Sequence, residues 1–359
     1  MMNRTNKTGS AVSLRSAQSV PSEPLKPHSP LTRAPSPLLS FARKLRTSET
    51  ALGIVRYAFR TFQRIGISLV PNHYYWPVPD FQELEARTWP AEQLPVGFDL
   101  AFEKQLDFLR NVVPQYEPEW APDSGSIGSA GYTRGNGFFE TVDAEIAYCL
   151  VRNLKPKRII EVGAGYSSRV LVAALEKNLI VDGVRGELLT IDPHPDRFPT
   201  EALSDRVRLI PASVQSIDLD IFLSLEEGDF LFLDSTHVVG IGSDVVREYL
   251  EILPRVNRGV LIHAHDIFIP SDYPRKMVLQ NLSFWSEQYL LQALLMFNPR
   301  FEVVWGSSAM QGFNPEALGQ AFPHWKNSYQ NMAPDKRRFL PSLDGERVWP
   351  SSFWIRKIV

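Results

Sequence analysis

Short apolar runs alternate with amphipathic patterns over residues 158–263, and this alternation is the clearest structural signal in the chain. Ile159, Ile160 and Val162 are typical of a strand that is buried on both faces. The pattern predicts strands at 158–162, 187–191, 206–210, 229–234 and 259–263. It predicts helices at 143–153, 167–178, near 197–203 and at 243–253. Because strands that alternate with helices form parallel sheets, we expect a doubly wound α/β domain.

The later part of the chain is predicted to contain a helix, two strands and an irregular insertion. The expected bounds are 276–297 for the helix, 301–305 and 352–356 for the strands, and 307–349 for the insertion. The insertion is rich in Pro, Asn and Gly, which favour loops. We expect it to form a lid or a contact between subunits.

The N-terminal part differs in composition from the rest of the chain. Residues 1–50 hold eight Lys or Arg against two Glu, a balance of +6 that leaves −8 for residues 51–359 in a chain of net charge −2. Because this Ser- and Pro-rich basic tail cannot bury enough apolar surface, we expect it to be disordered. A helical and extended segment is expected at 51–136, and the main domain at 137–359.

A basic amphipathic helix is predicted from Ala51 to Val70. Apolar residues recur there at three- and four-residue steps, beside a stripe formed by Arg56, Arg60 and Arg64. Packing of the apolar face against the main domain or a second subunit is the expected use, and contact with an anionic membrane is the alternative. The following segments are expected to be a stiff extended stretch at 71–79, a helix at 98–113 and a loop at 114–137.

Composition excludes several classes of protein. The chain is 44% hydrophobic and 22% charged, which argues against disorder of the whole chain and against a nucleic-acid partner. No apolar stretch approaches the roughly 18 residues of a spanning helix, and the N-terminus lacks the apolar core of a secretory signal. The single cysteine, Cys149, excludes an internal disulfide and is expected to be a packed apolar side chain. We therefore expect a cytoplasmic, globular enzyme.

A glycine turn follows the first strand of the main domain. Gly163 and Gly165 permit a tight turn with close approach of a ligand, and Ser167 or Ser168 can cap the next helix. Asp192 ends the next strand, where a carboxylate can accept hydrogen bonds from both hydroxyls of a ribose. These features indicate an adenosine-type cofactor and leave nicotinamide and methionine cofactors open. Ser168 occupies the last position of a full Gly-x-Gly-x-x-Gly motif, which weighs against a nicotinamide cofactor.

Histidines gather at the predicted strand ends. Four of the seven in the chain fall there, namely His194, His237, His263 and His265. We expect His194 to be a loop residue and His263 to be buried. His237, His265 and Asp266 are the catalytic candidates, because they follow the fourth and fifth strands and converge over one cleft. Imidazole titrates near neutrality and can take a proton from a hydroxyl or an amine.

Several of these motifs resemble the class I S-adenosylmethionine-dependent methyltransferases, over roughly residues 137–357. They are Glu161-Val-Gly-Ala-Gly-Tyr-Ser167, Asp192 and Phe232-Leu-Asp234. Ser235-Thr-His237 and His263-Ala-His-Asp-Ile-Phe268 are similar to a group of bacterial small-molecule methyltransferase-like proteins. The resemblance implies a seven-stranded, mostly parallel Rossmann-like sheet with an antiparallel last strand, and S-adenosyl-L-methionine as cofactor.

The same resemblance implies roles for individual residues. Glu161 and the Gly163–Gly165 turn would surround the methionine part of the cofactor, Asp192 would hold the ribose, and Asp234 would lie beside the amino group. The complete set of expected cofactor-binding residues is Glu161, Gly163, Ala164, Gly165, Tyr166, Ser167, Asp192 and Asp234.

The expected function is O-methylation of a small molecule or a sugar hydroxyl, by in-line transfer with histidine as the general base. A catalytically inactive cofactor-binding or assembly domain is the alternative, and an NAD-dependent oxidoreductase is the lesser one. Asp234 and Asp266 resemble the acidic metal ligands of catechol-type methyltransferases, in which a divalent ion binds adjacent hydroxyls. His265-Asp266 stands where that group often has Asp-Asn, so the use of a metal stays open. A homo-oligomer is a further expected partner state.

Overall fold

The structure is a computed structural model that describes residues 49–68, 77–87, 94–120, 127–134, 136–194, 207–279, 281–325 and 350–359. Four expected features lie outside these residues in whole or in large part. They are the tail up to residue 48, the start of the extended segment 71–79, the helix near 197–203, and the insertion from 326 to 349. The chain divides into two units, Met1–Pro71 and Asn72–Val359, and each is described by itself.

The first unit contains α2 (Glu49–Arg64), the expected amphipathic helix. This helix ends earlier than predicted because the chain turns at Gly66, whose φ of 80° lies in the left-handed region. None of the helices in the described part of the chain is long and apolar enough to cross a membrane. The expected membrane or subunit contact of α2 stays a prediction.

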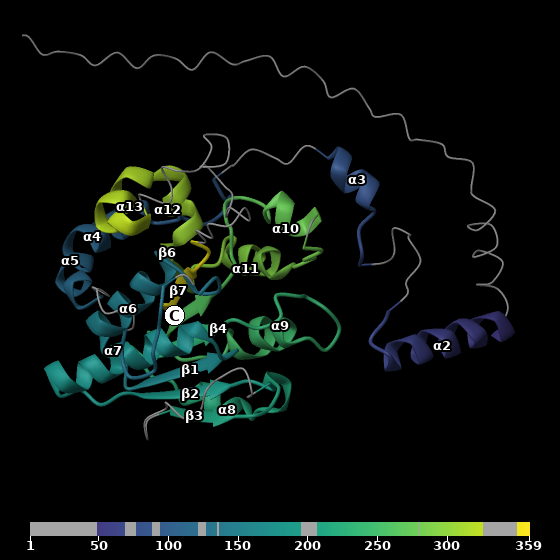
Figure 1. Cartoon of the computed structure of the whole chain (residues 1–359), viewed down its shortest axis with the longest axis horizontal. Helices are drawn as coiled ribbons and strands as arrows, with labels where there is room; N and C mark the ends of the chain where they lie inside the picture. Colours follow the sequence, from purple (N-terminus) through teal and green to yellow (C-terminus); the bar gives the residue numbers. More distant parts are fainter. Residues whose placement is uncertain are drawn as a thin grey trace, which may run out of the picture. The chain divides into compact units, whose positions relative to one another are not determined.

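The second unit is built on a seven-stranded sheet with the strand order β3-β2-β1-β4-β5-β7-β6 (Figure 1). The strands are β1 (Arg158–Val162), β2 (Glu187–Ile191), β3 (Val207–Ile210), β4 (Phe230–Leu233), β5 (Leu261–Ala264), β6 (Phe301–Gly306) and β7 (Phe353–Lys357). The first five strands pair in parallel, whereas β7 lies between β5 and β6 and is antiparallel to both. The expected fold class is therefore confirmed, including the antiparallel last strand.

Helices cover both faces of this sheet. Before β1 lie α3 (Phe81–Ala86), α4 (Phe102–Asn111), α5 (Val113–Tyr116), the 3-10 helix η1 (Glu117–Trp120) and α6 (Asp143–Leu154). Between β1 and β5 lie α7 (Tyr166–Asp182), the 3-10 helix η4 (Val214–Ser216), α8 (Leu219–Leu223), α9 (Asp244–Arg247) and the π-helix η5 (Glu248–Ile252). After β5 come α10 (Arg275–Leu279), α11 (Glu287–Leu295), α12 (Ser307–Phe313) and α13 (Pro315–Ala321).

Two apolar cores follow from the alternation of side chains along the central strands. Ile159 and Phe232 point to the core that α6 and α7 cover, whereas Ile160 and Leu233 point to the core that α8, η5 and α11 cover. The central strands β1 and β4 are therefore buried on both faces, as their near-continuous apolar runs predict. Cys149 lies buried in the first core, which confirms its expected structural role.

The predicted helix at 276–297 is wrong, because the chain forms two separate helices there. Residues 281–286 between α10 and α11 are not helical, and Leu282 has a φ of 57°. Asn281, Ser283 and Ser286 are residue types whose side chains compete with helical hydrogen bonds. As a result α11 begins at Glu287, and its first turn is free to contact another part of the chain.

Two predicted irregular stretches are also partly helical. The loop expected at 114–137 begins with α5 and η1, because Trp120 is buried against Tyr132 and Tyr148. The insertion expected to be irregular begins with α12 and α13, whose Met310 and Leu318 are fully buried. Tertiary packing decides the structure in both places, and local composition does not reveal it.

Candidate active site

The glycine turn after β1 lies against the chain that leaves β4. Gly163 has a φ of 90°, and its N–H donates to the carbonyl of Ile191 at 2.9 Å. A Cβ atom added at Gly163 would lie 1.9 Å from the carbonyl oxygen of Asp234. The fold therefore requires glycine at this position, for its conformation and for its lack of a side chain.

Asp192 joins the turn after β1 to the turn after β2. Its carboxylate accepts a hydrogen bond from the Ala164 N–H at 2.9 Å and another from the His194 N–H at 2.6 Å. His194 itself is exposed in the loop after β2, as expected. Gly165 is extended, with a φ of −176°, and a Cβ atom there would meet nothing within 4 Å. The space beside Gly165 is open at the edge where a ligand is expected.

Glu161 is fully buried near the end of β1, and its carboxyl group already has hydrogen-bond partners. It accepts hydrogen bonds from the hydroxyls of Ser167 at 2.8 Å, Ser168 at 2.6 Å and Thr190 at 2.8 Å. Burial raises the pKa of Glu161 to about 7, although these three hydroxyls lower it. Glu161 thus ties the start of α7 to the sheet. Ser168 in turn accepts from the Gly165 N–H at 3.1 Å.

Because Glu161 keeps its proton to a higher pH when the protein is folded, we predict a pH-dependent stability difference from Glu161→Gln. The unfolded carboxyl ionises near its ordinary pKa of 4.5 and the folded one near 7, so the contribution of Glu161 to stability is complete below about pH 4.5. It is lost as the pH rises to about 7, a change on the order of 3 kcal/mol. Urea titrations between pH 4.5 and 8 should show the wild type losing stability relative to the variant. Glu187→Gln, at an exposed position of β2, is the matched control; equal pH dependence of all three proteins would contradict the prediction.

Tyr166 is the first residue of α7, and its ring packs between two other side chains beside the glycine turn. Its ring stacks on Phe138 with an interplanar angle of 6°, and the guanidinium carbon of Arg169 lies 5.2 Å from the centroid of the Tyr166 ring. Phe138 is 69% exposed, so this stack faces solvent beside the turn. The next residue, Phe139, is buried and contacts the ring of His265.

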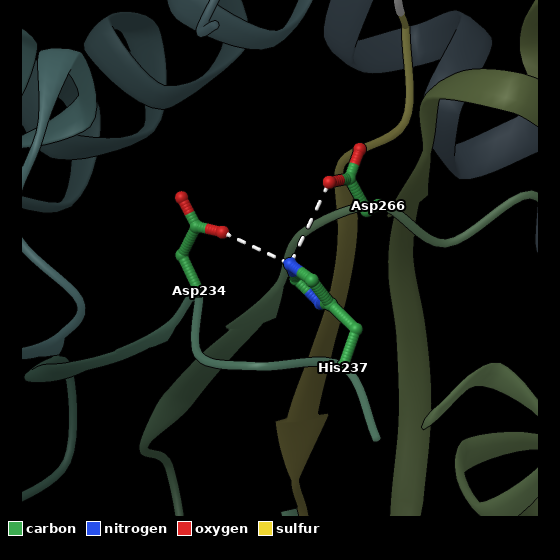
Figure 2. Close-up of side chains that lie close together, drawn as sticks. All are labelled: Asp234, His237 and Asp266. Atoms are coloured by element: carbon green, nitrogen blue, oxygen red, sulfur yellow. Dashed lines mark ion pairs between the residues drawn. The ribbon is translucent and has the colours of Figure 1, made fainter. Parts of the chain in front are cut away.

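Asp234, His237 and Asp266 meet past the ends of β4 and β5 (Figure 2). The His237 ring lies between the two carboxylates, with Nε2 at 3.4 Å from Asp234 Oδ1 and 3.5 Å from Asp266 Oδ2. The Asp234 side chain is 30% exposed and that of Asp266 18% exposed, whereas that of His237 is 7% exposed. The opening of the site is therefore at the two carboxylates, and the imidazole lies behind them.

A third carboxylate holds the other side of the His237 ring. Nδ1 lies 2.8 Å from Glu287 Oε2, and Glu287 is 1% exposed. Burial alone would lower the pKa of His237, but Asp234, Glu287 and Asp266 raise it well above its ordinary value. Burial alone would likewise raise the pKa of Asp234, but His265 and His237 lower it. The resting site thus favours an imidazolium between carboxylates.

His265 and His263 lie deeper in the site. His265 Nε2 is 3.9 Å from Asp266 Oδ1, and its Nδ1 has no hydrogen-bond partner among the described residues. Burial would lower the pKa of His265, but Asp266, Asp234 and Asp143 raise it. His263 is fully buried, as expected, and pairs with the Ser352 hydroxyl at 2.8 Å. Burial lowers the pKa of His263 well below its ordinary value, so His263 is a neutral structural residue.

Asp266 is oriented by the segment that enters β7. Its Oδ1 accepts a hydrogen bond from the Ser351 hydroxyl at 3.1 Å. Buried Asp143, at the start of α6, accepts the backbone N–H groups of Ser351 and Ser352 at 2.7 and 3.0 Å. Burial raises the pKa of Asp143 to about 6, although His265 and these donors lower it. Chain segments more than 200 positions apart in sequence therefore fix one side of the site.

Sequence reasoning missed the buried groups behind His237. Glu287 was expected in the middle of a helix, whereas it stands at the start of α11 with its side chain bonded to His237 and to Tyr249. Glu248 and Tyr249 lie on the π-helix η5, a type of helix that is often found at functional sites. Burial raises the pKa of Glu248 well above its ordinary value, and its carboxyl accepts from the Ser235 hydroxyl at 3.1 Å. Ser286-Glu287, an N-terminal signal of a helix, was the available clue.

Asp234, His237 and Asp266 could hold a metal ion as well as a proton. One ligand atom from each lies within 4.8 Å of the others, and two carboxylate oxygens with one imidazole nitrogen are a donor set that divalent cations accept. Glu287 would then support the imidazole from behind, as second carboxylates do in many metal sites. The geometry is suited to either use of Nε2.

Comparison with known proteins adds to this geometry. Residues 160–267 match a family model described as a methyltransferase domain, a stretch that runs from β1 past Asp266. An uncharacterized protein of Archaeoglobus fulgidus is 27% identical over 175 residues, which cover 46% of this chain and 77% of that protein.

Among solved structures, the SAH-bound methyltransferase of Podospora anserina is 17% identical with a TM-score of 0.38, covering 75% of this chain and 99% of that chain. The O-methyltransferase of Bacillus cereus in complex with SAH is 18% identical with a TM-score of 0.30, covering 56% of this chain and 86% of that chain.

Proposed function

We propose that this chain, a class I S-adenosylmethionine-dependent methyltransferase, transfers a methyl group to a hydroxyl oxygen of a small molecule or sugar, with His237 as the general base. The observation that carries the proposal is the position of the His237 ring between Asp234 and Asp266, past the carboxyl ends of β4 and β5. Asp234 also contacts the glycine turn through its backbone, so the acid group and the cofactor turn adjoin.

The residues present fit the cofactor. A Cβ at Gly165 would meet nothing within 4 Å, so the turn leaves room for a ligand beside the backbone. Asp192 accepts one backbone hydrogen bond on each oxygen and keeps further lone pairs for a ribose diol. The Glu161 carboxyl group already accepts hydrogen bonds from three hydroxyls, so we propose that its role is to position the start of α7 and not to contact the cofactor. When bound, the cofactor supplies an activated methyl group on a positively charged sulfonium.

The chain's own residues then orient the acceptor and receive its proton. An acceptor hydroxyl that enters between Asp234 and Asp266 reaches Nε2 of His237, because the site opens at these two carboxylates. When the methyl carbon bonds to the acceptor oxygen, its bond to the sulfonium sulfur would break and leave a neutral thioether, and the proton of the acceptor hydroxyl would pass to Nε2 of His237. The ring must be neutral for this step. Positive charge brought into the site favours the neutral ring, since it offsets the carboxylates that raise the pKa of His237.

A metal-assisted reaction is the second candidate, and the donor set of Asp234, His237 and Asp266 is the observation that favours it. A divalent cation held there would polarise the acceptor oxygen. The two roles exclude each other at one atom, because the single lone pair of Nε2 cannot bind a cation and take a proton. We place the base first, since Nε2 already faces the open edge of the site between the two carboxylates.

The test is transfer of a labelled methyl group from S-adenosylmethionine to a panel of small phenols, catechols and sugars. We expect the label in an ether product, formed equally before and after treatment of the protein with EDTA. Transfer that EDTA abolishes and Mn²⁺ or Mg²⁺ restores would replace the base by the metal-assisted mechanism. Cofactor binding without transfer to any acceptor in the panel would favour the non-catalytic cofactor-binding or assembly domain.

A further inference from the structure

The start of α11 is hydrogen-bonded to the loop that carries His237. His237 has a φ of 62°, a conformation that costs free energy for a residue with a Cβ atom. Its carbonyl oxygen accepts the N–H groups of Ser286 at 2.9 Å and Glu287 at 3.1 Å. The Ser286 hydroxyl in turn accepts the N–H of Val239 at 2.9 Å. The unpaired donors at the beginning of a helix thus hold the backbone on both sides of His237.

The Glu287 side chain holds the ring of the same histidine. Oε2 lies 2.8 Å from Nδ1 of His237, and Oε1 accepts the Tyr249 hydroxyl at 2.8 Å. Glu287 and Tyr249 are each 1% exposed, so water does not compete for these bonds. A carboxylate oxygen at this distance is the acceptor that an Nδ1–H group requires. The contacts of Glu287 with His237 and Tyr249 together fix the tilt of the imidazole ring.

We infer that Glu287 is a positioning residue, which binds the Nδ1–H of His237 and so leaves Nε2 as the nitrogen that faces Asp234 and Asp266. The inference rests on the proposed function, in which Nε2 receives the acceptor's proton. It also extends that function to a residue 50 positions further along the chain. Glutamate is suited to this position because a glutamine of the same shape can present its amide N–H₂ to Nδ1, which would favour a proton on the wrong nitrogen.

The test is NMR of the full chain with ¹⁵N-labelled histidine, in the absence of cofactor and acceptor. We expect a strongly downfield proton bonded to Nδ1 of His237, because a charge-assisted bond to a carboxylate is short and strong. Glu287→Gln should move this resonance upfield or remove it. Tyr249→Phe should move it further downfield, because Glu287 loses a competing donor and becomes a stronger acceptor. Ser286→Ala, the matched control, loosens the loop but keeps the carboxylate, and should retain the resonance.

Opposite shifts in the Glu287 and Tyr249 variants would not come from a merely structural role. With a substrate that the wild type methylates, Glu287→Gln should lower kcat by at least about 10-fold and leave KM for S-adenosylmethionine unchanged. Absence of a downfield Nδ1 proton in the wild type, or its retention in Glu287→Gln, would overturn the inference. Should Glu287→Gln fail to fold, the Tyr249→Phe shift decides the matter. A His237→Asn variant with full activity would overturn the proposed function and leave the NMR result standing.

Discussion

Gly163→Ala is expected to lower the free energy of unfolding by about 3 kcal/mol or more, which is a large part of the roughly 5–15 kcal/mol of an ordinary folded chain. The added Cβ would lie 1.9 Å from the Asp234 carbonyl oxygen. Because this oxygen belongs to the backbone that follows a buried strand, it cannot move aside as a flexible side chain could. The φ of 90° at residue 163 adds a second cost. Chemical denaturation, or the yield of folded protein where the variant does not accumulate, measures the effect.

Gly165→Ala is the matched control, because it changes the same turn without a clash. A Cβ there would meet nothing within 4 Å, and the φ of −176° suits any residue. The variant should fold with wild-type stability and bind S-adenosylmethionine at least about 10-fold more weakly, if the cofactor approaches the turn closely. Equal stability of Gly163→Ala and wild type would contradict the packing argument. Unchanged affinity in Gly165→Ala would remove the turn from the binding site.

His237→Asn is expected to lower kcat for methyl transfer by about 10²- to 10⁴-fold, because asparagine cannot take a proton. Asparagine tolerates the positive φ of 62° at this position and can still bond to Glu287, so the fold should survive. The affinity for S-adenosylmethionine should be retained, since no expected cofactor contact is lost. Single-turnover rates with a found acceptor, together with calorimetric binding, separate the two effects.

His265→Asn tells the two candidate bases apart. Its Nδ1 has no partner among the described residues, and its ring packs on Phe139, so its removal should act mainly through packing and through the charge beside Asp266. A large loss of kcat in His265→Asn with full activity in His237→Asn would reassign the base. Full activity in both variants would exclude a histidine base.

The fold was predictable from the chain because its central strands are apolar on both faces. β1 and β2 have the bounds that their apolar runs predict, and β4 and β5 differ by a few residues only. The positions of β6 and β7 in the sheet were not predictable in this way. Their amphipathic patterns indicate strands but carry no information on pairing, and the antiparallel edge followed from the resemblance to a family.

The helix predicted at 276–297 and the loop predicted at 114–137 differ from the structure for the same physical reason, which is contact between distant parts of the chain. Apolar residues continue at helical spacing through 276–297, yet the chain breaks before Glu287 because the start of α11 bonds to the His237 carbonyl. α5 and η1 form where a loop was expected, because Trp120 is buried against Tyr132 and Tyr148 and Glu119 pairs with Arg152 at 2.6 Å. The partners in these contacts are not evident from the local sequence, although Ser286-Glu287 signals that a helix begins there.

The candidate site was predictable where it follows strand ends and hidden where it does not. Asp234, His237 and Asp266 come together because the carboxyl ends of parallel strands meet at one edge of a sheet. The domain boundaries and the individual roles of these residues stay predictions. Glu287 escaped notice because a buried glutamate inside an apolar pattern has no signature of its own until the histidine it holds is known.

Cofactor binding is tested most directly by calorimetric titration of S-adenosylmethionine into the full chain, repeated with Asp192→Asn. We predict saturable binding of one cofactor per chain, weakened about 10- to 100-fold in the variant, which keeps the shape of the side chain but loses the charge that receives the ribose hydroxyls. No binding by the intact, folded wild type would contradict it.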